Sequence, residues 1–79
     1  MGEPYIGKKS DIMNKMAIAE LFKDHQADAE ELWLQALSLY PKHFDTKVNY
    51  EMYQWKYGII SDNQLLENLS EVFKNKYKG

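Results

Sequence analysis

Residues 29–41 have the sequence AEELWLQALSLYP, and this stretch is the clearest indication of the fold in the chain. Ala29, Trp33 and Ala36 follow one another at intervals of four and three residues, so on a helix they share one face. The alanines let a second helix approach closely, while the tryptophan fills the adjoining gap. Pro41 ends the pattern, because the residue before a proline disfavours the α conformation. The stretch therefore predicts one half of a helical hairpin.

The rest of the chain predicts three further helices. Apolar residues recur every three or four positions from Asp11 to His25, from Phe44 to Gly58 and from Ser61 onward. Residues 1–9 contain two glycines and a proline without such a period, and we expect them to form a flexible lead. No segment alternates apolar and polar residues as a strand does. The sequence therefore predicts an all-α domain of about four helices over residues 10–79.

Several helix ends are also marked. Asp28 and Glu31 form a capping-box pattern, which places the start of the second helix at Asp28. Ser61 and Gln64 form the same pattern at the start of the fourth helix. Gly58 is expected to end the third helix, because glycine tolerates the left-handed conformation common at that position.

The composition disfavours several classes of function. The 79 residues include no cysteine, so neither disulfides nor thiolate chemistry is expected. Every cation is a lysine and the net charge is −2, which argues against nucleic-acid binding. No apolar run approaches the roughly 20 residues that span a bilayer, so we expect no membrane contact and a cytoplasmic location. No nucleophile–base set, carboxylate pair or phosphate loop is visible, and we expect no enzyme.

Two smaller features receive a structural explanation. The histidines, His25 and His43, have no second histidine nearby, and we expect no metal or other cofactor. The lysines near the C-terminus, Lys74, Lys76 and Lys78, are explained by the favourable interaction of cations with a helix C-terminus.

The chain resembles the tetratricopeptide repeat family, whose units of 34 residues are pairs of antiparallel helices. Ala17, Ala29 and Ala36 match the three small positions of the repeat. Trp33 matches the aromatic residue between them, and Pro41 matches the terminal proline. The resemblance implies a right-handed array of helical hairpins, with roughly two units in this chain.

The second unit departs from the family pattern. One repeat further along, the small positions hold Glu51, Asn63 and Ser70, although Gly58 and the turn after it match. We expect Glu51 to face solvent, with an ion pair to Lys47 as the alternative. The fourth helix is therefore expected to be a solvating cap, since terminal units of repeat arrays are atypical.

The resemblance also implies a binding groove, because in this family the first helix of each hairpin lines a concave surface. The groove positions carried over to this chain are Asn14, Ile18, Leu21, Val48, Asn49, Met52 and Trp55. Val48, Met52 and Trp55 lie at helical intervals and share one face. The alternative is that this stripe packs against another helix and meets no ligand.

The sequence thus predicts a protein-interaction scaffold that binds a peptide or a neighbouring domain. The alternative is a structural module that self-associates, as a homodimer or by packing on an adjacent domain of the same protein. The segment from Ala36 to Asp62 also resembles repeat tails found beside protein kinase or WD-repeat domains, which would make the chain an accessory module.

Overall fold

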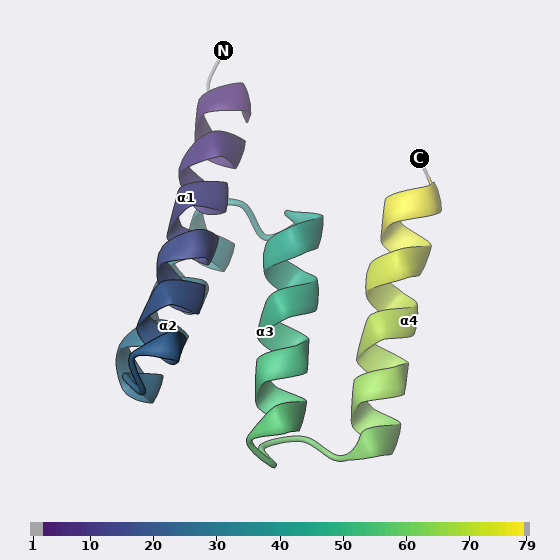
Figure 1. Cartoon of the computed structure of the whole chain (residues 1–79). Coiled ribbons are helices and arrows are strands. Elements are labelled where there is room, and N and C mark those ends of the chain that lie inside the picture. Colours follow the sequence, from purple (N-terminus) through teal and green to yellow (C-terminus); the bar gives the residue numbers. More distant parts are fainter. Residues whose placement is uncertain (1–2, 79) are drawn as a thin grey trace.

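A computed structural model describes the backbone of residues 3–78 and the side chains of residues 8–77. Within that range the chain forms four α-helices and no strand, and the prediction of an all-α domain is confirmed. The helices are α1 (Glu3–Phe22), α2 (Gln26–Leu39), α3 (Phe44–Lys56) and α4 (Asp62–Lys78). Each helix runs antiparallel to the one before it, so the start of α1 and the end of α4 lie at the same end of the molecule (Figure 1). None of these helices is long and apolar enough to cross a membrane.

The first helix begins earlier than the sequence predicts. Residues 3–9, expected to be a flexible lead, are helical, and residues 1 and 2 lie outside the described residues. The expected lack of helix is wrong because Pro4 lies in the first turn, where a missing backbone N–H costs no hydrogen bond. The longer helix brings Ser10 to a buried position, where its hydroxyl donates to the carbonyl oxygen of Ala36 at 3.1 Å.

Both helical hairpins turn through the same backbone motif. Asp24 follows α1 with φ 67°, and Gly58 follows α3 with φ 75°. The N–H of the next residue donates to the carbonyl oxygen five positions earlier, at 2.9 Å in the first turn and 2.8 Å in the second. This is the bond pattern of a Schellman motif. The role of Gly58 is confirmed, whereas α1 ends at Phe22 rather than at His25.

The N-terminal caps of α2 and α4 differ. Ser61 Oγ accepts a hydrogen bond from the backbone N–H of Gln64 at 3.1 Å, which confirms the predicted cap of α4. In α2 the cap position is His25, without a side-chain cap bond. The prediction that Asp28 caps this helix is wrong, because the tight turn after α1 lets α2 begin at Gln26. Asp28 lies instead in the first turn, where its charge complements the helix dipole.

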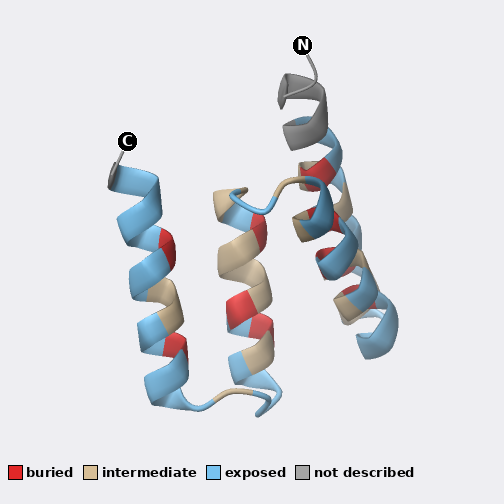
Figure 2. Cartoon of the chain, turned by 180° about the vertical axis from the view of Figure 1, so that it is seen from behind, coloured by how far each residue is buried: buried red, intermediate tan, exposed pale blue. Residues whose placement is uncertain are grey.

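The core lies where the first three helices meet. Ala17, Ala29 and Ala36 have no exposed surface, so α1 and α2 approach closely. Trp33 is buried beside them, and its ring centroid lies 5.1 Å from that of Tyr53 on α3. Seen from behind, the buried residues form bands on the facing sides of the helices (Figure 2). The tryptophan and tyrosine therefore attach α3 to the first hairpin.

The fourth helix packs against α3 alone among the described helices. Its buried apolar residues are Leu65 and Val72. Glu51 is buried between α3 and α4, and the expectation that it faces solvent is wrong. The amide of Asn68 donates to Glu51 Oε1 at 2.7 Å, which replaces the lost hydration, and Lys47 Nζ lies 3.9 Å from Oε2.

Candidate functional site

An open, largely apolar hollow lies between the C-terminal halves of α1 and α3. It has a volume of about 290 Å³. The residues that line it are Ile18, Leu21, Trp33, Asn49, Met52, Tyr53, Trp55 and Lys56. A smaller hollow continues it past Phe22 and Tyr57. Concave sites lined mainly by apolar and aromatic side chains are the ordinary form of ligand-binding surfaces.

Local helix geometry brings these side chains together. Ile18 and Leu21 are three residues apart on α1, as are Met52 and Trp55 on α3, so each pair lies on one helix face. Ile18 and Leu21 also pack against the core from one side. On α3, Met52 is 42% exposed and Trp55 is 41% exposed. Neighbouring apolar side chains on two helices therefore leave surface that no part of the described chain covers.

The indole of Trp55 is held in a fixed position. Its Nε1–H donates to Asp62 Oδ1 at 2.6 Å. Asp62 is the first residue of α4, directly after the turn that follows α3. A large aromatic side chain that is already ordered loses less conformational entropy when a partner covers it.

Hydrogen bonds below the hollow join three helices. Asn14 Oδ1 accepts from Trp33 Nε1 at 2.7 Å and from Asn49 Nδ2 at 3.1 Å. Asn14 is only 3% exposed, so its amide is a structural link rather than part of the open surface. The bonds fix α1, α2 and α3 relative to one another, and thereby the width of the hollow.

The structure brings five of the seven residues predicted for the groove to one hollow. These are Ile18, Leu21, Asn49, Met52 and Trp55. Asn14 lies beneath it, and Val48 is partly buried on α3 without lining it. The sequence did not indicate Tyr57 or Asp62. Tyr57 could have been found from its four-residue spacing from Tyr53, which places both side chains on one helix face. In the structure the two rings lie 5.2 Å apart.

Two tyrosines beside the hollow remain protonated. Burial raises the pKa of Tyr53, and the hydrogen bond that its hydroxyl donates to Glu30 Oε1 at 2.7 Å raises it further. Burial also raises the pKa of Tyr50, with a smaller contribution from the negative charges of Glu30 and Glu51. Neutral hydroxyls with raised pKa are hydrogen-bonding groups here rather than bases.

One group of potential metal ligands lies in the part of the chain that the structure describes. Glu20, His25 and Asp28 place one ligand atom each within 4.8 Å of the others at the turn between α1 and α2. His25 Nδ1 lies 2.8 Å from Glu20 Oε1, and Lys23 Nζ lies 3.1 Å from Oε2. These contacts, His25 first, lower the pKa of Glu20. Glu20 is therefore already engaged by His25 and Lys23, and the other two members of the cluster, His25 and Asp28, are exposed.

Comparisons of the chain with family models, curated proteins and solved structures give no match. The geometry of the hollow is therefore the basis for a proposed function.

Proposed function

We propose that the chain is a protein-interaction module that binds an apolar segment of a peptide, or of a neighbouring domain, in the hollow between α1 and α3. The observation that carries the proposal is the pair Met52 and Trp55, which are half exposed at a concave surface. The bond from Trp55 to Asp62 supports it, because the aromatic anchor is ordered before a partner arrives.

A tetratricopeptide-like arrangement is part of this proposal. Two antiparallel hairpins with left-handed residues at Asp24 and Gly58, one 34-residue period apart, support it. In such arrays the first helix of each hairpin lines the concave side, and here α1 and α3 border the hollow. The cytoplasmic location, expected because no apolar run is long enough to span a bilayer, also belongs to the proposal.

The expected ligand is an amphipathic helix or extended peptide with two or three apolar side chains. Leu21, Met52 and Trp55 would contact a ligand through apolar surface rather than through hydrogen bonds of fixed geometry. The flexible methionine side chain adapts to different ligand side chains. Truncation of a central aromatic anchor at such an interface costs about 2 kcal/mol or more, which corresponds to roughly thirty-fold in affinity.

A selection from displayed random peptides tests the proposal. Peptides enriched on the wild-type chain should share apolar positions at helical or alternating spacing. Their affinity should fall by about ten-fold or more for Met52→Glu, because a charge is then desolvated in the hollow. Leu34→Glu is the matched control, since Leu34 is 49% exposed on α2 and does not line the hollow. Equal binding to both variants, or no enriched peptide, would contradict the proposal.

Self-association is the second candidate, and α4 provides the observation for it. Leu66, Phe73 and Tyr77 lie at helical intervals, and Leu66 and Tyr77 are 63% and 76% exposed. Sedimentation velocity over a wide concentration range would show a dimer that Leu66→Glu abolishes. A monomer at every concentration would reject this candidate.

A further inference from the structure

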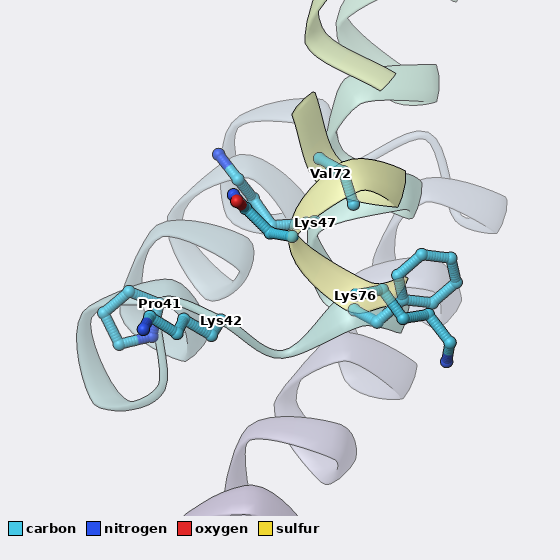
Figure 3. Close-up of a pocket in the computed structure, with 7 residues that line it drawn as sticks. Pro41, Lys42, Lys47, Val72 and Lys76 are labelled. Carbon is cyan, nitrogen blue, oxygen red and sulfur yellow. The ribbon is translucent and has the colours of Figure 1, made fainter. Parts of the chain in front are cut away.

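A second hollow lies at the other end of α3, between the turn that precedes this helix and the last turns of α4 (Figure 3). It has a volume of about 130 Å³. The residues that line it are Pro41, Lys42, Phe44, Lys47, Val72, Asn75 and Lys76. A cavity of about 150 Å³ holds a group the size of benzene, so this hollow suits one apolar side chain.

The rim of this hollow is basic. Lys42, Lys47 and Lys76 come from the turn, from α3 and from α4, and no aspartate or glutamate lines the hollow. The chain as a whole has a net charge of −2, so this concentration of lysines is local. Among the ion pairs of the described residues, Lys47 takes part in one, with its Nζ 3.9 Å from Glu51 Oε2, and Lys42 and Lys76 take part in none. Two of the three lysines therefore form no ion pair at the hollow.

The floor is apolar and packed. Phe44 meets Phe73 edge to face, with ring centroids 5.2 Å apart. Lys76 Nζ lies 4.1 Å from the centroid of the Phe44 ring, so this ammonium is held beside the hollow by a cation–π contact. Val72, which is buried, closes the floor from α4. An apolar floor and a cationic rim favour a ligand that carries both an apolar side chain and negative charges.

We propose that this hollow binds an acidic peptide segment, in which one apolar side chain enters the hollow and flanking carboxylates contact Lys42, Lys47 and Lys76. Charge complementarity identifies the occupant, since lysines act as point charges toward carboxylates without requiring one geometry. A membrane surface fits less well. Three lysines fall below the clusters of 4–8 that anchor proteins to anionic lipids.

This site is separate from the hollow between α1 and α3. Phe44 and Trp55 lie at opposite ends of α3, eleven residues apart, which is roughly 16 Å along a helix. The two hollows have no lining residue in common. The inference therefore does not depend on the proposed function, and each site can fail its test without the other.

Fluorescence anisotropy with a labelled peptide tests the inference. The probe carries one leucine between two pairs of glutamates, and a second probe has alanine in place of leucine. The leucine probe should bind saturably, and the triple substitution Lys42→Gln, Lys47→Gln and Lys76→Gln should weaken it about five-fold or more. The alanine probe should bind more weakly than the leucine probe. All three substitutions lie on exposed or half-exposed side chains, and circular dichroism verifies the fold.

The matched control removes the same charge elsewhere. Lys8 and Lys15 on α1 and Lys23 directly after it are exposed, and their replacement by glutamine should leave binding of the leucine probe unchanged apart from a small long-range effect. Equal weakening by both triple variants would overturn the inference, because it would show attraction by overall charge. Equal affinity for both probes, no binding, or binding confined to vesicles that contain phosphatidylserine would also overturn it.

Discussion

The two hairpins of this molecule have the same type of turn but differ in how closely their helices pack. The left-handed residues of their turns are Asp24 and Gly58, 34 positions apart. In the first hairpin, the contact between α1 and α2 contains Ala17, Ala29 and Ala36, all fully buried. One period later, the second hairpin has Glu51, Asn63 and Ser70. Of these, only Glu51 is buried.

The difference shows that side-chain size at a few positions sets the distance between helices, while the turn sets only their direction. Alanines allow close approach and a continuous apolar contact. A buried glutamate needs a hydrogen-bond donor, and Asn68 on α4 supplies it. The second hairpin is therefore held partly by a polar contact, and α4 keeps large apolar residues such as Leu66 exposed.

The largest expected effect comes from enlarging a close contact. Ala36→Trp should unfold the domain, because Ala36 has no exposed surface and overpacking costs about 1–3 kcal/mol or more. Ser70→Trp is the matched change in the second hairpin, where the side chain is exposed and little loss is expected. Thermal melts followed by circular dichroism compare the two. Similar melting of both variants would reject the contrast between the hairpins.

The next effect concerns the polar contact of the second hairpin. Asn68→Ala should reduce the free energy of unfolding by about 1–3 kcal/mol, because Glu51 then loses its buried hydrogen bond. In urea denaturation, the double variant Glu51→Ala, Asn68→Ala should lose less than the sum of the single losses. Strict additivity would show that the two side chains do not stabilise each other.

The residue types at the left-handed positions of the two turns, Asp24 and Gly58, can be exchanged. Asp24→Gly should stabilise the protein by about 1 kcal/mol, because a left-handed conformation costs a residue with a Cβ atom energy that glycine does not incur. Gly58→Asp should destabilise it by a similar amount. Chemical denaturation of the two variants measures both signs. The same sign for both changes would argue against equivalent turns.

The smallest effect is a pH dependence in the region where α3 meets the first hairpin. The pKa of Tyr53 is raised in the folded chain, so ionisation favours the unfolded state. The tyrosine contribution to stability should be complete below about pH 10 and should fall as the pH rises through the folded pKa. In urea unfolding at alkaline pH, Tyr53→Phe should give a shallower decline than the wild type. Identical declines would assign the dependence to other groups.

The parts of the fold that were predicted correctly are those with local causes. The alanine and tryptophan spacing of α2, the break at Pro41, Gly58 after α3 and the Ser61 cap each depend on residues close in the sequence. Pro4 and the nearby glycines suggested a flexible lead, yet the first turn of a helix accepts proline.

Features that depend on distant residues were not predictable in the same way. The burial of Glu51 requires Asn68, which lies 17 positions away on another helix. In the candidate site, too, only the features that depend on nearby residues could be predicted. The stripe of Met52 and Trp55 follows from helical spacing, whereas the role of Asn14 beneath the hollow requires Trp33 and Asn49 from two other helices. The bond from Trp55 to Asp62 spans a turn whose shape had to be known first.

The accessibility of Trp55, measured by ¹⁹F NMR of protein that carries 5-fluorotryptophan, tests whether the hollow between α1 and α3 is an open binding surface. The two resonances, from Trp33 and Trp55, are assigned with Trp55→Phe, and a soluble gadolinium complex reports their exposure. We predict that Trp55 is broadened at every protein concentration and becomes protected when a selected peptide is added, while Trp33 is protected throughout. Protection of Trp55 in the pure protein at high dilution would contradict the account, because the hollow would then be part of the core.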